Sequence, residues 1–308
     1  MTKIIFRKRH SPFIKKFDST PEGVVCPHFY ILAHANGCLY DCAYCYLKHT
    51  MRNTLIEGTN KPAPNVFTNT DDIKKELATW GEKTEPSILN AGELADSFMD
   101  VKYLQVLFES FAYDKNVKKH TLLFVTKGGK NVVDALRQYP ALDNVIVSFS
   151  VSTNAGMYEM GAPDVTERLV AAKMLSEFGW RIRLRIDPLV PEELAGRKVD
   201  SQDEIIKCVN AKPERITLGS LRFSYNWRYH KWLRKATSES DYCGYNNKAY
   251  KMRLPLAARK TMYESVLAAL RTYGYEGWVG FCKETLDIYK HFNLDPKEPV
   301  CNCSLHGD

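Results

Sequence analysis

Short apolar runs alternate with amphipathic stretches along most of the chain. The runs are rich in β-branched and aromatic residues, a composition typical of buried strands. They cover residues 28–32, 87–90, 121–126, 145–151, 181–186 and 215–218. Between them apolar residues recur every three or four positions, as at Phe98, Val101 and Leu104, which predicts amphipathic helices. Alternating strands and helices indicate an α/β protein whose parallel sheet is wrapped by helices.

Helices are expected between these strands and after the last of them. One has a capped start near Asp71. The others are predicted over residues 98–113, 131–139, 165–178 and 255–273, and a last strand over 278–281. The chain therefore divides into an irregular arm at 1–27, about six βα units at 28–220 and an extension at 221–308.

Polar residues follow the ends of successive predicted strands. In order of strands one to five they are the cysteine-rich loop at 38–45, Gly92 with Glu93, Lys127, Ser150 with Ser152, and Asp187. The carboxyl ends of parallel strands meet at one edge of the sheet, where ligand sites of α/β proteins lie. We therefore expect these polar groups to face one site.

Composition narrows the class of protein. Of the 308 residues 44% are hydrophobic and 26% charged, which is ordinary for a globular protein. No run of about 18 apolar residues occurs, so no membrane span is predicted. The basic N-terminus lacks the apolar core of a secretion signal, so we expect a cytoplasmic protein. In a reducing compartment, nine clustered cysteines favour metal binding over disulfides.

Three of these cysteines form one compact motif. Cys38, Cys42 and Cys45 have the spacing Cys-x3-Cys-x2-Cys. A structural zinc site takes four ligands, so zinc would need a fourth, for which His34 and His49 are nearby candidates if they are not residues of the fold. A 4Fe–4S cluster held by three thiolates keeps one iron open for a substrate or cofactor.

Positive charge is concentrated in one window. The chain has a net charge of +7, whereas residues 212–260 hold twelve Lys or Arg against three acids, a net +9. The same window contains eight aromatic residues from Phe223 to Tyr250. A basic surface with aromatic faces binds phosphates and stacks bases, which favours nucleic-acid binding. The alternative is a solvated basic face over an ordinary aromatic core.

The cysteine motif resembles the signature of the radical S-adenosylmethionine (SAM) superfamily, in which an aromatic residue, here Tyr44, precedes the third cysteine. Within it, the chain is similar to the spore photoproduct lyase family of DNA repair enzymes from about residue 26 to residue 293. The similarity rests on short motifs in a fixed order. They are residues 44–46, 124–127, 161–163 with 168–169, 185–188, 217–223, 251–253 with Arg259, and 282–284.

This resemblance implies a partial (βα)6 barrel of the TIM type and a defined chemistry. Cys38, Cys42 and Cys45 would hold a 4Fe–4S cluster whose open iron binds SAM. Reduction by a flavodoxin- or ferredoxin-type donor then cleaves SAM to a 5′-deoxyadenosyl radical, which abstracts a substrate hydrogen. Glu93 matches the group that receives the SAM amino group, and Lys127 matches a partner of its carboxylate. The implied cofactor-binding residues are Gly92, Glu93, Lys127, Ser150, Ser152 and Arg185.

One departure bears on the reaction. Spore photoproduct lyases return a hydrogen atom to the product thymine radical from a cysteine shortly after the second strand, and residues 90–97 contain none. Substitutes in space are Cys26, Cys208, Cys243 and Cys282. Tyr44 and Tyr46 are candidates for relaying the hydrogen, and Asp96 for orienting substrate or SAM. A radical rearrangement would need no donor.

The expected function is radical repair or modification of a nucleobase, a thymine-derived base in DNA. Predicted phosphate contacts are Arg222, Arg228, Lys231, Lys251, Arg253 and Arg259. Alternatives are spore photoproduct lyase proper with a substitute donor, a radical SAM enzyme acting on a peptide or small metabolite, and a non-enzymatic zinc-binding nucleic-acid module. The sequence leaves open whether Cys282, Cys301 and Cys303 bind a second metal, whether SAM is recycled, and the oligomeric state.

Overall fold

The main feature of the computed structural model is one large sheet. The structure describes residues 4–51, 55–57, 61–154, 156–224, 239–241 and 251–305. The strands of the sheet are β2 (Ile14–Phe17), β4 (Phe29–Leu32), β8 (Ile88–Asn90), β9 (Thr121–Thr126), β10 (Val145–Ser150), β12 (Arg181–Leu189), β13 (Arg215–Ser220) and β17 (Trp278–Phe281). Their order is β17-β13-β12-β10-β9-β8-β4-β2. Neighbours from β4 to β17 are parallel, and β2 pairs antiparallel with β4. In the described part of the chain the sheet stays open, with β2 and β17 at its edges.

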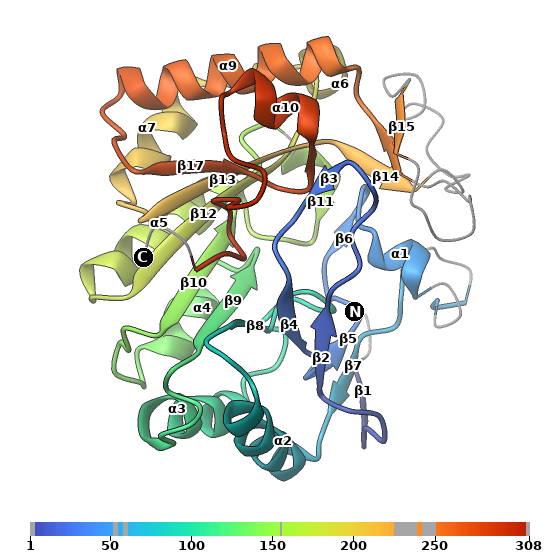
Figure 1. Cartoon of the computed structure of the whole chain (residues 1–308), viewed down its shortest axis with the longest axis vertical. Coiled ribbons are helices and arrows are strands. Elements are labelled where there is room, and N and C mark those ends of the chain that lie inside the picture. Colours follow the sequence, from blue (N-terminus) through green and yellow to red (C-terminus); the bar gives the residue numbers. More distant parts are fainter. Residues whose placement is uncertain are drawn as a thin grey trace.

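Helices connect these strands and run along one side of the sheet (Figure 1). They are α2 (Thr70–Lys83), α3 (Leu104–Tyr113), α4 (Lys130–Leu136), α5 (Val165–Glu177), α7 (Gln202–Asn210) and α9 (Leu256–Thr272). Shorter helices are α1 (Leu47–Thr50), α6 (Glu192–Ala195), α10 (Leu286–His291) and a 3-10 turn at Gly156–Tyr158.

Strand alternation separates two cores on the two faces of the sheet. Leu122 and Phe124 of β9 belong to the large core that also contains the apolar faces of the helices. Leu123 and Val125 point to the opposite, inner face and belong to a smaller cluster that packs against Cys26, Cys303 and Leu305. The C-terminal segment therefore lies on the inner side of the partial barrel.

Smaller pairings hold the loops around the sheet. β6 (Asp41–Cys42) pairs with β11 (Glu159–Met160), and β3 (Val24–Val25) pairs with β18 (Glu284–Thr285). β7 (Asn65–Phe67) pairs with β1 (Ile5–Arg7) and β5 (Ala35–Asn36). β16 (Lys251–Arg253) pairs with β14 (Arg222–Ser224) and β15 (Glu239–Asp241).

The predicted α/β fold is confirmed, and each predicted strand is present. The helix predicted from Phe98 begins instead at Leu104, because the Asp96 carboxylate accepts a hydrogen bond from the Phe98 amide and turns the chain there. The sheet extends across the boundary expected at residue 220, because β17 of the expected extension pairs with β13. The expected irregular arm at 1–27 contributes β2 to the same sheet. Within the described residues, no helix has the length and apolarity that crossing a membrane requires.

Candidate active site

The three-cysteine loop follows β4 at the carboxyl edge, the edge where the parallel strands end. Backbone hydrogen bonds fix it on both sides: the Gly37 amide donates to Leu94 O, and the Ala43 amide donates to Tyr158 O. Gly37 has a φ of 77°, and a Cβ there would lie 2.8 Å from the Ala63 carbonyl oxygen, so this entry to the loop requires glycine. Cys42 stands opposite Glu159 in the β6–β11 pair.

The chemistry of this donor set fits a thiolate-bound cluster. Cys38, Cys42 and Cys45 are all free thiols on one loop. Burial raises the pKa of each thiol, while the nearby Lys127 ammonium acts in the opposite direction on Cys42 and Cys45. Bound metal supplies the charge that deprotonates such thiols. Among the described side chains, no three His, Cys, Asp or Glu are grouped as a site for a metal ion.

Glu159 of β11 contacts the three-cysteine loop through side-chain bonds. It is 2% exposed, forms a buried ion pair with Arg168, and accepts a hydrogen bond from the Tyr44 hydroxyl. The Lys127 ammonium lies 3.1 Å from Glu159 Oε1 and 5.8 Å from the centre of the Tyr44 ring. Burial alone would raise the pKa of Glu159, but Lys127 and Arg168 outweigh it, so the pKa is below its ordinary value. Glu159 is therefore an ionised centre that holds Tyr44 and Lys127 beside the cysteines.

Sequence reasoning missed Glu159. The motif at 161–163 with Arg168 lies next to it, and that motif was the available signal. Glu159 itself is not part of that motif, and its partners Tyr44 and Lys127 are distant in sequence.

Asp96 holds the turn that presents Lys127. Its carboxylate accepts hydrogen bonds from the Lys127 amide at 2.7 Å, the Thr126 hydroxyl at 2.9 Å and the Phe98 amide at 3.0 Å. Burial raises its pKa. Since these bonds use both carboxylate oxygens, the geometry favours a positioning role over the predicted contact with substrate or SAM.

The turn at Gly92 and Glu93 meets Tyr46 at the same edge. A Cβ on Gly92 would lie 2.5 Å from the Val125 carbonyl oxygen, so glycine is required for packing against β9. The Tyr46 hydroxyl donates to the backbone oxygen of Glu93, and its ring is 38% exposed. The Glu93 carboxylate lies 3.6 Å from the Lys283 ammonium.

The two predicted serines differ in their surroundings. The Ser152 hydroxyl is fully buried and donates to the Pro188 carbonyl, which argues against a contact with the SAM ribose. Ser150 is also buried and stands opposite Arg185 in the register of β10 and β12. Arg185 donates to Asp187 Oδ2 at 2.7 Å, while its buried Nε has no hydrogen-bond partner among the described residues.

Arg222 lies at the carboxyl edge and not on an outer surface. Its guanidinium is 3.3 Å from Asp187 Oδ2 and donates to the Cys282 carbonyl at 2.6 Å, and its side chain is 10% exposed. Burial would raise the pKa of Asp187, but Arg222 and Arg185 hold it well below its usual range. Asp187, Arg185 and Arg222 thus form a second charged group of the site, of which sequence reasoning linked only the first two to the cavity.

Two of the predicted phosphate contacts do not fit the structure. Arg253 and Arg259 are 1% and 2% exposed, and both pair with the buried Glu284. This burial contradicts a phosphate contact, because each guanidinium is turned into the protein. Arg228 and Lys231, and the side chain of Lys251, lie outside the described residues.

His34 is a core residue. Its ring stacks on Tyr103 at 3.9 Å between centroids, and its Nε2 lies 3.0 Å from the Ala91 carbonyl oxygen. These contacts argue against His34 as a fourth metal ligand. The side chain of the other candidate, His49, is outside the described part.

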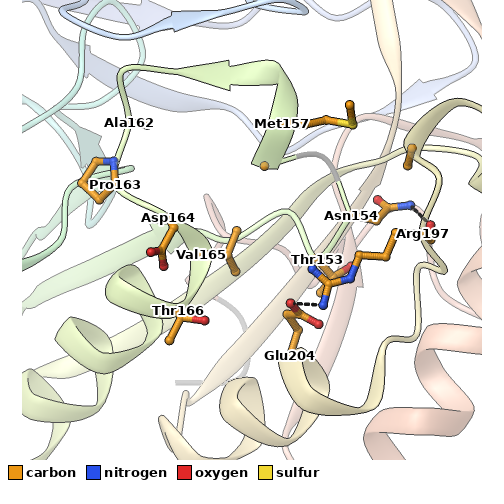
Figure 2. A pocket seen from close by; sticks show the side chains of 12 residues that line it. Thr153, Asn154, Met157, Ala162, Pro163, Asp164, Val165, Thr166, Arg197 and Glu204 are labelled. Atoms are coloured by element: carbon orange, nitrogen blue, oxygen red, sulfur yellow. Dashed lines mark hydrogen bonds and ion pairs between the residues drawn. The ribbon is translucent and has the colours of Figure 1, made fainter.

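A separate pocket of about 370 Å³ opens behind the loop that carries β11 (Figure 2). Its lining includes Met157, Asp164 and Arg197, and Arg197 reaches Glu204 across it. The predicted site residues do not line it.

A partial barrel of parallel strands, with a three-thiol loop after its first parallel strand, defines the class of radical SAM proteins. The family model described as spore photoproduct lyase matches residues 16–242. The chain therefore belongs to the spore photoproduct lyase family.

Solved structures agree with this assignment at the level of the fold. A spore photoproduct lyase complexed with dinucleoside spore photoproduct is 20% identical with a TM-score of 0.69, over 91% of this chain and 82% of that one. A double mutant of spore photoproduct lyase with bound AdoMet and the same dinucleoside is 18% identical with a TM-score of 0.66, over 90% and 81%. A search of curated proteins found no significant match.

Proposed function

We propose that this radical SAM enzyme uses a 4Fe–4S cluster and SAM to repair or modify a thymine-derived base in DNA. The observation that carries the proposal is the free three-thiol loop at the carboxyl edge, with Lys127 and the Gly92-Glu93 turn beside it. Family membership supports the class of reaction. The solved relatives bound to dinucleoside spore photoproduct support a DNA-derived substrate.

In this proposal Cys38, Cys42 and Cys45 hold the cluster, which together with SAM supplies a 5′-deoxyadenosyl radical. The chain's own residues bind and orient. Lys127 offers an ammonium for the SAM carboxylate, and the Glu93 backbone oxygen or carboxylate accepts from the SAM amino group. Glu159 keeps Lys127 and Tyr44 in place, so it is a positioning residue.

Hydrogen return to the product is assigned to Tyr46 in preference to Tyr44. Both hydroxyls donate a hydrogen bond, Tyr44 to the buried Glu159 carboxylate and Tyr46 to the Glu93 backbone oxygen, but Tyr46 is the more exposed of the two at the carboxyl edge. Of the substitute thiols, Cys208 is fully buried within α7, and Cys243 lies outside the described residues. Cys26 and Cys282 stay as alternative donors, and Tyr46 is proposed in the place of the cysteine that residues 90–97 lack.

Substrate binding at the edge involves Arg222, with Arg185 beside it. These two guanidiniums face Asp187 and supply donors for a base carbonyl or phosphate. A base within a duplex must leave the stack, which costs a few kcal/mol and less at a damaged base. Arg228, Lys231 and Lys251 stay proposed as phosphate contacts, and a flavodoxin or ferredoxin stays proposed as the electron donor.

The test is turnover of dinucleoside spore photoproduct by the anaerobically reconstituted enzyme, with deuterated solvent as the label. Wild type should form thymine products that carry deuterium from an exchangeable group. Tyr46→Phe should cleave SAM but lose this label, and Tyr113→Phe, at an 84% exposed tyrosine, should behave as wild type. Turnover of peptides or small metabolites, with no response to the dinucleoside, would contradict a DNA-base substrate.

A further inference from the structure

Four cysteines outside the three-thiol loop converge from three distant segments. Cys26 precedes β4, Cys282 follows β17, and Cys301 and Cys303 lie in the C-terminal segment. All four are free thiols in the described part of the chain, and no three of them are grouped closely enough to hold a single metal ion, so the centre to consider is a cluster of several irons. They lie far apart along the sequence, so their approach is a property of the fold.

Backbone contacts bring the three segments together. In the β3–β18 pair Val25 stands opposite Glu284, which places Cys26 beside the residues that follow β17. A Cβ on Gly280 would lie 1.3 Å from the Val300 carbonyl oxygen, so the C-terminal segment lies directly against β17. Arg215 fixes the segment by donating to the Cys301 carbonyl at 2.7 Å.

Two of the four side chains lie on the inner face of the sheet. Cys26 and Cys303 pack against the same inner cluster of Phe29, Ile88, Leu123, Val125 and Ile146. Asn90 Nδ2 lies 3.9 Å from Cys303 Sγ. Burial raises the pKa of Cys26 and of Cys303, and nearby thiols add to it: Cys301 and Cys282 at Cys26, and Cys301 and Cys26 at Cys303.

Cations border these thiols. Arg185 Nη2 and Arg222 Nη2 each lie 3.5 Å from Cys282 Sγ. The Lys283 ammonium opposes the effect of burial on the pKa of the Cys26 thiol. These three cations face two carboxylates, Asp187 and Glu93. These groups leave a net positive charge beside the thiols, and a 4Fe–4S cluster held by four thiolates carries a negative one.

We propose that Cys26, Cys282, Cys301 and Cys303 hold a second iron–sulfur cluster on the inner side of the partial barrel. Four thiolates fill the coordination of a 4Fe–4S cluster, so this centre has no open iron and does not bind SAM. The Cys-x-Cys pair chelates from the C-terminal segment, and the four thiol protons are released on binding. The cluster would tie that segment to β17 and to the chain before β4.

The test compares iron and acid-labile sulfide in anaerobically reconstituted variants. Wild type should hold roughly eight irons per chain. The triple variant C38A/C42A/C45A should keep about half of these irons, in the second cluster. When that cluster is reduced, its electron paramagnetic resonance signal should not change on addition of SAM. The double variant C301S/C303S should lose the other half and keep a signal that SAM changes. Cys208→Ala, at a buried cysteine of α7, is the matched control and should hold the wild-type content.

Three outcomes would overturn the proposal. They are a folded triple variant without iron, a double variant with the iron content of wild type, and zinc in place of iron at these thiols. Circular dichroism of each variant separates loss of the cluster from loss of the fold. The inference does not rest on the proposed function, because a chain unable to cleave SAM would still show the second cluster in the triple variant.

Discussion

At the scale of single residues, Glu159 is a buried carboxylate with three side-chain partners near the site. It joins the cysteine loop, the Lys127 turn and α5 through Tyr44, Lys127 and Arg168. A buried ion pair costs desolvation when it forms, but removing one partner leaves the other charge buried and unpaired. A substitution that keeps the shape of the Glu159 side chain but removes its charge should therefore destabilise the fold.

Glu159→Gln should lower the free energy of unfolding by about 3–5 kcal/mol, because the buried Arg168 guanidinium loses its counter-charge. Urea unfolding of the metal-free chain measures this directly. Glu177→Gln, at a glutamate whose side chain is 59% exposed beside Lys173, should change it by less than about 0.5 kcal/mol. Equal effects of the two substitutions would show that the Glu159 network is not structural.

His34 should make stability depend on pH. Burial lowers the pKa of His34 to about 4 from an ordinary 6.5, so between these values the unfolded chain binds a proton that the folded chain does not. Stability is then full above pH 6.5 and falls by up to about 3 kcal/mol as the pH drops toward 4. Urea unfolding from pH 7 to pH 4 measures the slope.

His34→Asn should remove that part of the slope, and His10→Asn, at an exposed histidine, should leave the pH profile as in wild type. A His34→Asn chain with the full wild-type slope would mean that other groups cause the pH dependence.

At the scale of elements, the C-terminal segment, residues 300–305, is held against the inner face of the sheet by hydrogen bonds from two arginines. Arg183 donates to the Asn302 carbonyl at 2.8 Å, and Arg215 donates to the Cys301 and Ser304 carbonyls at 2.7 and 2.9 Å. Both arginines are buried. Their planar guanidinium groups can serve several carbonyls at once, which a lysine ammonium cannot do in the same geometry.

Arg215→Lys should loosen this segment. Hydrogen exchange of the amides at 301–304 should accelerate, and the free energy of unfolding should fall by about 2 kcal/mol, since the Cys301 and Ser304 carbonyls each lose one of their donors. Exchange measured by mass spectrometry on peptides from the C-terminus gives the local effect. Arg137→Lys, at a 67% exposed side chain, is the control. Unchanged exchange at 301–304 would show that Arg215 does not hold the C-terminal segment in place.

Local pattern explains how much of the fold was predictable. The strands were found because each is a short apolar run, and the helices because their apolar faces repeat. The start of α3 was misplaced because the turn at Asp96 is held by contacts with Thr126 and Lys127, which are distant in sequence. The docking of the C-terminal segment has no periodic signal at all, since backbone carbonyls make its bonds.

The same limit applies to the site. Cys38, Cys42 and Cys45 were identified because their spacing is local. Charge counting failed for Arg253 and Arg259, because their partner Glu284 is brought close only by the fold. The sequence thus gives the sign of the net charge of a region, but it does not show which of the cations in that region face solvent.

At the scale of the whole molecule, the carboxyl edge gathers the three-thiol loop, Lys127, the Glu93 turn and the Arg185, Asp187 and Arg222 group. These come from five separate strand ends of one sheet. The arrangement brings the residues proposed for the cofactor and those proposed for the substrate to one edge of one sheet. The three-thiol loop at this edge is the proposed place of radical formation.

That claim is tested most directly by the yield of 5′-deoxyadenosine when the anaerobically reconstituted chain is reduced in the presence of SAM. Wild type and Cys208→Ala should both release 5′-deoxyadenosine, whereas Cys42→Ala should release none above the background of reductant and SAM alone. A wild-type chain that binds zinc and yields no 5′-deoxyadenosine, or a Cys42→Ala chain with the wild-type yield, would contradict the account.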